Sequence, residues 1–373
     1  MRVRVAGLGH PSERRPVTST PAPVRTPPPT PRRPPTAGLC LALTAVLAAS
    51  VVAGVALGPV RIPFDDVVRF LAAALTGGTI DAAEAGPYRI VWDIRLPRVL
   101  LAAVVGAGLS VVGVAIQAMV RNALADPYVL GISSGASVGA TAVVTTGLFA
   151  SLGIYALSTA AFLAALAAMA LVYVVTGGGL TPLRLVLTGT ALAYGFSAVA
   201  MLLVFQSPRG EAARAAMFWL LGSLGGVTWT SLPIAAAVTA AGVVYLRTRA
   251  KHLNALSLGD ETATTLGIDV SRTRKALFGV TAAMTGVLVA VSGAVGFVGL
   301  MLPHLVRLVV GADHRKVLAV APLAGACFLI WVDVAARLLA APEELPLGVI
   351  TAALGVPCFI LLMRRRGYVF GGR

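Results

Sequence analysis

The chain has 373 residues, of which 57% are hydrophobic and 12% are charged, about half the roughly 25% charged share of a soluble globular domain. This composition excludes an ordinary soluble enzyme and indicates an integral membrane protein. Lys and Arg (30) outnumber Asp and Glu (15), but basic residues of membrane proteins collect in cytoplasmic loops, so we expect no nucleic-acid partner. The three cysteines lack CxxC spacing and are expected to be small core residues.

Residues 1–36 differ from the rest of the chain because they are rich in proline and arginine and almost free of long apolar side chains. Such a segment cannot bury a core, and we expect a disordered cytoplasmic tail rather than a signal peptide. Residues 37–373 form the expected transmembrane domain.

About ten apolar runs follow the tail, each a candidate for the roughly 20 residues that a helix needs to cross a bilayer. They predict an all-α integral membrane protein in which the eighth run is short. The expected spans lie near 38–58, 99–119, 128–149, 153–176, 183–205, 230–247, 275–295, 297–311, 317–340 and 346–363.

An even number of spans places both ends of the chain on one side of the membrane. Most of the 30 Lys and Arg residues fall in the tail, in residues 247–275 and after residue 363, all on the same predicted side. By the positive-inside rule, both termini are expected in the cytoplasm of a cell that carries the chain in its plasma or inner membrane.

The second expected span carries a stripe of small and polar residues at spacings of 4, 3 and 4, which stacks them on one helical face. This stripe predicts either a seam for close helix packing or a lining of a transport pathway. Its members are Gly106, Ser110, Gly113 and Gln117.

A second polar cluster, Pro303, His304 and Arg307, interrupts the apolar segment GFVGLMLPHLVRLVVGADHR. Polar groups within a membrane segment are costly unless helices or water satisfy them, so they are usually functional. No metal-ligand partners for His304 are evident, and we expect a hydrogen-bonded histidine without a metal.

Two long segments resemble the signatures of the FecCD-type ABC importer permease family, which carries iron-siderophore, vitamin B12 and haem substrates. The first is GAGLSVVGVAIQAMVRNALADPYVLG, which departs from the family at Ala123, where proline is usual, and the second is VSGAVGFVGLMLPHLVRLVVGADHR, followed by WVDVAARLL and ELPLGVITAALGVPCFILL. The similarity covers about residues 39–366. The family-motif residues are Arg121, Asn122, Pro127, Gly131, Pro303, His304, Arg307, Asp333, Glu344 and Pro346.

The resemblance implies a type II ABC importer permease with ten helices, in which helices 2–5 and 7–10 are related as inverted repeats. It also implies four kinds of contact: a second permease subunit, identical or different, two ATP-binding subunits, a substrate-binding lipoprotein and membrane lipid. The chain lacks a P-loop and a coherent catalytic set, so we expect no enzyme activity and no cofactor of its own. ATP and Mg would be bound by the partner ATPase subunits.

Residues 251–268 lie between the sixth and seventh spans and predict two short helices around a turn at Gly259. Asp260 is expected to cap the second helix, and Gly267 to end it. In the family this segment is similar to the loop that couples the permease to its ATPase. The implied coupling residues are Leu253, Asn254, Leu256, Leu258, Gly259, Asp260, Glu261, Leu266 and Gly267.

Arg95, Arg98 and Arg337 fall on the predicted outer side, where positive charge is scarce. The resemblance implies that they dock carboxylates of the binding protein, which guanidinium groups can pair bidentately. Asp333 lies four residues before Arg337, and the alternative is an internal ion pair.

The sequence therefore predicts the permease subunit of an ATP-driven importer, with ferric siderophore as the expected substrate and vitamin B12 or haem as the alternative. An ion-gradient-driven secondary transporter would require ionisable residues at mid-membrane, where only Asp333 and His304 come near. A structural membrane scaffold is a third alternative, and it predicts no effect of ATP.

Overall fold

The computed structural model describes residues 35–207 and 210–364, and these residues contain no β-strand. All but the last two residues of the predicted tail lie outside the described residues. The all-α fold predicted from the sequence is confirmed.

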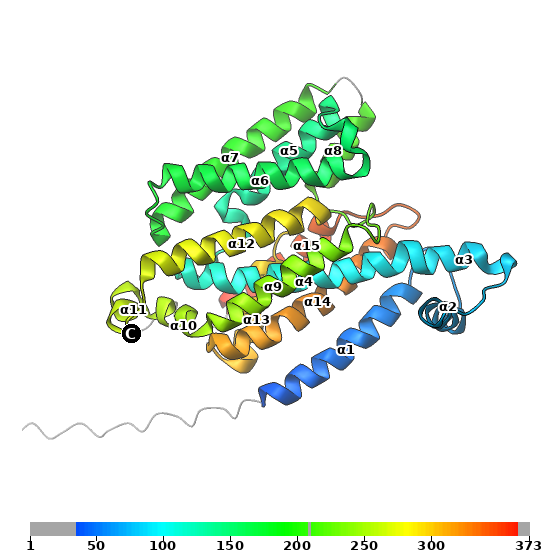
Figure 1. Cartoon of the computed structure of the whole chain (residues 1–373), viewed down its shortest axis with the longest axis horizontal. Coiled ribbons are helices and arrows are strands. Elements are labelled where there is room, and N and C mark those ends of the chain that lie inside the picture. Colours follow the sequence, from blue (N-terminus) through cyan, green and yellow to red (C-terminus); the bar gives the residue numbers. More distant parts are fainter. Residues whose placement is uncertain (1–34, 208–209, 365–373) are drawn as a thin grey trace, which may run out of the picture. The chain divides into compact units, whose positions relative to one another are not determined.

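A helix occupies each of the ten predicted positions (Figure 1). Six helical stretches are long and apolar enough to cross a membrane, and three shorter apolar helices accompany them in the described part of the chain. The ten helices are α1 (Thr36–Ala56), α4 (Leu96–Val120), α5 (Ile132–Thr146), α6 (Ala156–Val175), α7 (Pro182–Phe205), α9 (Leu232–Thr248), α12 (Val270–Ser292), α13 (Val298–Val310), α14 (His314–Leu338) and α15 (Leu347–Arg364).

Several short helices connect the long ones and were not predicted, because they are too short or too polar to span a bilayer. Helix α4 also begins earlier than expected, since short helical segments run into it continuously from Ala82. The connecting elements are α2 (Phe64–Thr76), η1 (Ala82–Glu84), α3 (Ala85–Arg89), η2 (Ile90–Arg95), η3 (Pro127–Leu130), η4 (Ala150–Tyr155) and α8 (Gly210–Leu220). Two more, α10 (Ala250–Leu258) and α11 (Asp260–Thr265), form the predicted coupling segment.

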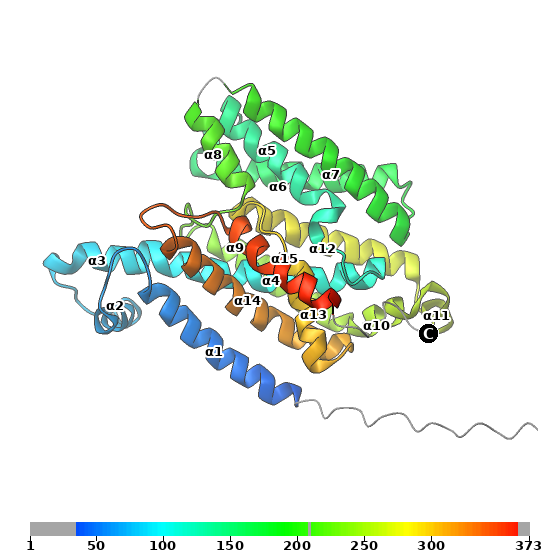
Figure 2. The same cartoon turned by 180° about the vertical axis from the view of Figure 1, so that it is seen from behind.

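Helix α4 is the centre of the helical domain, in contact with α9, α12, α13 and α14 (Figures 1 and 2). Two of its glycines permit this packing. A Cβ atom on Gly106 would lie 2.2 Å from the carbonyl oxygen of Gly325, and one on Gly113 would lie 1.9 Å from that of Gly299. Because both separations are far below contact distance, these positions accept only glycine at the present helix spacing.

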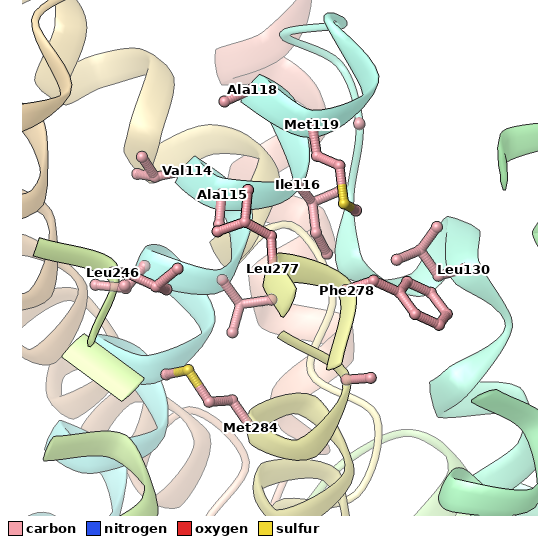
Figure 3. Close-up of a cluster of buried hydrophobic side chains, with 14 of the residues drawn as sticks. Val114, Ala115, Ile116, Ala118, Met119, Leu130, Leu246, Leu277, Phe278 and Met284 are labelled. Atoms are coloured by element: carbon pink, nitrogen blue, oxygen red, sulfur yellow. The ribbon is translucent and has the colours of Figure 1, made fainter. Parts of the chain in front are cut away.

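A hydrophobic cluster fills the space between α4 and its neighbours towards the end of α4 (Figure 3). Ile116 and Met119 of α4 lie beside Leu277 and Phe278 of α12, and Leu246 comes from α9. All five are at most 3% exposed. The coupling segment packs on this core.

Candidate functional site: the coupling segment and two polar networks

The coupling segment has the predicted helix, turn and helix. Helix α10 ends at Leu258, and Gly259 follows with φ +118°, a conformation that side-chain-bearing residues rarely adopt. Helix α11 then runs to Thr265, and Gly267, at φ +78°, terminates the segment through a hydrogen bond from its N–H to the carbonyl of Thr264.

The leucines of this segment divide into two pairs. Leu253 and Leu256, two of the implied coupling residues, are fully buried against the rest of the chain, so they present no surface to a partner. Leu258 and Leu266 are 69% and 63% exposed. These two leucines, with exposed Glu261 nearby on α11, form the surface that the segment presents outward.

Asp260 does not cap α11, contrary to the prediction, because Gly259 occupies the N-cap position. Its carboxylate instead accepts two hydrogen bonds from the Arg274 guanidinium of α12, at 2.6 and 3.0 Å. Arg274, which is 4% exposed, also donates from Nε to the carbonyl oxygen of Met119 at 3.4 Å. These bonds hold the pKa of Asp260 below its usual value and fasten α11 to the ends of α12 and α4.

Asn254 fastens the other helix of the segment. Its Nδ2 donates to the Asp313 carboxylate at 2.9 Å, and its Oδ1 accepts the backbone N–H of His314 at 2.9 Å. Asp313 also caps α14 by accepting the N–H of Arg315, and the amide of Asn254 is the main reason that its pKa is lowered. Both coupling helices are therefore linked by polar contacts to the long helices, and no periodicity in the sequence predicts these partners.

The two signature segments of the sequence meet inside the protein. Gln117 of α4 donates to the carbonyl oxygens of Gly299 and Leu300, each at 3.2 Å, and accepts a hydrogen bond from Arg307 of α13. Pro127 packs against Gly299, where an added Cβ would lie 2.7 Å from the proline ring. One packing unit therefore joins segments more than 170 residues apart in the chain.

The predicted α4 stripe faces other helices of the same chain. Ser110 is fully buried and donates to the carbonyl oxygen of Ala321 at 2.9 Å, while Gln117 is 3% exposed. Together with the two glycines, they form a packing seam, which was one of the two alternatives.

The remaining motif residues shape the connections between helices. Arg121 ends α4 in the left-handed region at φ 52°, and Gly131 precedes α5 at φ 74°. Asn122 accepts the N–H of Leu124 at 2.9 Å. Pro303 and His304 lie within α13, where both are buried. Pro346 directly precedes α15.

A second network lies at the opposite end of α4, around the carboxylate of Asp333. This group is fully buried and accepts bonds from Nε of Arg98 at 2.8 Å and Nε of Arg337 at 3.0 Å. Arg98 also pairs with Glu344 at 2.7 Å, and the Glu344 side chain is 33% exposed. The network joins α4, α14 and the connection to α15.

Arg95 and Arg337 also bind the carboxyl end of α1. Arg337 donates to the carbonyl oxygens of Leu57 and Gly54 at 2.8 and 2.9 Å, and Arg95 donates to three further carbonyls in residues 55–60. Cationic side chains donate hydrogen bonds to the unpaired carbonyls there and interact favourably with the negative end of the helix dipole. The three arginines expected to dock a binding protein are 3–6% exposed, so the structure places them in the interior with internal partners.

A cavity of about 1470 Å³ opens at the same end of the helices as the arginine network, between α6, α8, α9 and α12. Apolar side chains such as Phe162, Trp219 and Ile234 line its walls together with several serines and threonines. Its charged lining residues are Glu211 and Arg214 on α8.

A bundle of long apolar helices, with a turn-separated pair of short helices attached to one end, defines a multi-pass membrane protein. A family model places the chain more narrowly: residues 46–365 match the FecCD transport family. The chain belongs to this family, whose members are the membrane permease subunits of ABC importers, with ATPase activity in a separate subunit.

Individual relatives agree with this assignment. The chain is 42% identical to the cobalamin import system permease protein BtuC of Halobacterium salinarum, over 82% of this chain and 80% of the relative. It is 41% identical to the hemin transport system permease protein HmuU of Yersinia pestis, over 74% of this chain and 84% of the relative. A solved metal-chelate type ABC transporter in an inward-facing conformation matches 88% of this chain and 99% of its own, at 31% identity and a TM-score of 0.76.

Proposed function

We propose that this protein forms the pathway by which a metal chelate enters the cell, driven by ATP hydrolysis in a partner subunit. Ferric siderophore is the first candidate substrate, as expected from the sequence. Cobalamin or haem is the second, because these are the substrates named for the two relatives at 42% and 41% identity.

The observation that carries the proposal is the way the coupling segment is mounted. Two exposed leucines, Leu258 and Leu266, provide apolar contact, and the ties through Asn254 and Asp260 connect that contact to the long helices. A displacement imposed on this segment by an ATPase would therefore be passed to α4, α12 and α14 rather than absorbed by a loose loop. A structural scaffold would have no need of this arrangement.

The polar groups of the helical bundle argue against a transporter driven by an ion gradient. Such a protein requires an ionisable site that is open to the pathway in at least one state. Asp333 is fully buried between two arginines, and His304 is 7% exposed. Neither side chain is placed as an accessible carrier of ions in this state of the protein.

The complete importer would contain two permease subunits, two ATP-binding subunits that hold ATP and Mg, and a substrate-binding lipoprotein. Both termini of the permease would lie in the cytoplasm, and the coupling segment would face the ATPase there. The cavity of about 1470 Å³ lies at the other end, with mostly apolar and hydroxyl-bearing walls suited to a bulky chelate.

Uptake by proteoliposomes tests this function and separates the substrates. The permease is reconstituted with its ATPase and binding protein, and ATP-dependent accumulation of radiolabelled ferric siderophore, cobalamin and haem is measured, each against an excess of the other two. Saturable accumulation of one chelate that requires ATP supports the proposal and identifies the substrate. Accumulation that follows a proton or sodium gradient without ATP contradicts it.

A further inference from the structure

Helix α2 carries two apolar stripes, of which only one is covered by the protein. Val67 and Phe70 are buried, and the Phe70 ring stands edge-on to Tyr88 at 5.9 Å. The second stripe, Phe64, Val68 and Leu75, is 57%, 46% and 79% exposed. At 100° per residue these three positions fall within about 40° of one another, so they form a single exposed strip.

The charged residues of α2 lie on another face, where Arg69 and Asp66 form an ion pair. Arg69 donates to Asp66 at 2.7 Å and to Glu84 of η1 at 2.6 Å, and exposed Asp65 belongs to the same side of the helix. This acidic side neutralises its own arginine. Because Arg69 is paired with two carboxylates, the contact expected between the strip and lipid is apolar.

The position of α2 relates the exposed strip to the bilayer. Helix α1 is an apolar span that is only 17% buried in its most apolar window, so the described part of this chain leaves most of its surface uncovered, and α2 begins after a short connection from its end. In Figures 1 and 2, α2 is seen end-on while α1 and α14 run across the picture. Helix α2 therefore runs across the direction of the spans, in the orientation of the membrane plane.

We propose that α2 is an interfacial helix whose strip Phe64, Val68 and Leu75 is embedded in the lipid leaflet at the outer end of α1. Leu57 and Val60 in the connection, 40% and 53% exposed, extend the apolar surface from α1 to α2. Amphipathic helices bury such a face at the boundary between headgroups and acyl chains. The occupant of this surface is lipid, and the embedded helix fixes the depth of the α1 and α4 ends.

Fluorescent probes on single cysteines test this placement in the assembled permease. The native cysteines Cys40, Cys327 and Cys358 are first replaced, and Val68→Cys and Leu75→Cys are labelled with an environment-sensitive fluorophore in nanodiscs, where both membrane faces are open. Asp65→Cys and Thr76→Cys, exposed on the polar side of the same helix, are matched controls. All four substitutions are at exposed positions, so none removes a core contact.

The strip probes should emit at shorter wavelength than the controls and be quenched several-fold more by lipids that carry a nitroxide near the headgroup. The control probes should be quenched several-fold more by iodide in the water. Because the contact is apolar, zwitterionic and anionic nanodiscs should give the same pattern.

Equal quenching of strip and control probes by iodide would overturn the proposal, since the strip would then lie in water. Protection of the strip only after the binding protein is added would assign the surface to that protein instead. Disulfide-linked pairs of Leu75→Cys chains would assign it to a second copy. The readout depends on neither ATP nor substrate, so it stands or falls separately from the proposed function.

Discussion

Asp333 is the position at which the structure makes its strongest energetic prediction. Its fully buried carboxylate is the partner of two nearly buried guanidinium groups, those of Arg98 and Arg337. Replacing Asp333 by alanine leaves two buried positive charges, one with Glu344 alone as its counter-ion and the other with carbonyl oxygens alone. Removing one partner from a buried ion pair destabilises a protein by about 3–5 kcal/mol, and this cost is expected for Asp333→Ala.

Glu344→Gln provides a matched control. Its side chain is 33% exposed and pairs with the same Arg98, so its loss leaves Asp333 in place. Its carboxylate is partly solvated, and Arg98 keeps Asp333 as a counter-ion when Glu344 is changed. Both substitutions remove a carboxylate from one network, and Asp333→Ala should be the more costly of the two.

The free energy of unfolding is measured for both variants by titrating detergent-solubilised permease with SDS and following helicity. If Asp333→Ala costs no more than Glu344→Gln, the arginines do not depend on the internal network. They would then be available to a binding protein, as the family resemblance suggested. A large cost for Asp333→Ala with unchanged insertion supports the internal role found here.

Three further predictions concern the packing seam, the coupling segment and the tail. Gly113→Ala should lower thermal stability in detergent by an amount equivalent to about 1–3 kcal/mol, because the added Cβ would lie 1.9 Å from a carbonyl oxygen. Gly279→Ala is the control, and it should be neutral or stabilising because its added Cβ meets nothing within 4 Å. Equal effects of the two substitutions would refute the packing argument. Because the pKa of Asp260 is lowered, its bond to Arg274 stabilises the segment at pH values above the ordinary pKa of 3.8 and weakens as the pH falls through the lower folded pKa. Amide-exchange protection of residues 260–265, corrected for intrinsic rates, should therefore stay constant from neutral pH to about 4 and fall below that pH. Protection lost near pH 6 would point to another group. Deletion of residues 1–34 should leave uptake near normal, with lower insertion efficiency as basic charge is lost, and abolished uptake by normally inserted protein would contradict this.

The spans could be predicted from the sequence because a bilayer leaves few alternatives to apolar helices of a fixed length. The turn of the coupling segment could also be predicted, since Gly259 and Gly267 adopt positive φ values that local chemistry demands. These features depend on residues close together in the chain. Helix α8 could not be predicted in this way, because its 11 residues are too few to span a bilayer.

The partners of the charged residues could not be predicted in the same way. Arg98 meets Asp333 across 235 residues, and Arg274 reaches past Asp260 to a carbonyl of α4 that carries no sequence signal. The burial of Leu253 beside exposed Leu258 also follows from how α10 rests on the long helices rather than from its composition. The sequence indicates only the side of the membrane on which such residues fall. Tertiary packing decides whether their side chains are exposed there.

In the proposed importer, ATP hydrolysis in a partner subunit drives this permease through Leu258 and Leu266. The most direct test measures substrate-stimulated ATP hydrolysis and chelate uptake by reconstituted importer with both leucines changed to aspartate. Leu148→Asp, an exposed leucine remote from the coupling segment in the connection after α5, is the control for an added surface charge. The double variant should insert normally but lose both activities, while the control retains them. Unchanged stimulation and uptake in the double variant would show that these leucines do not couple the permease to its ATPase.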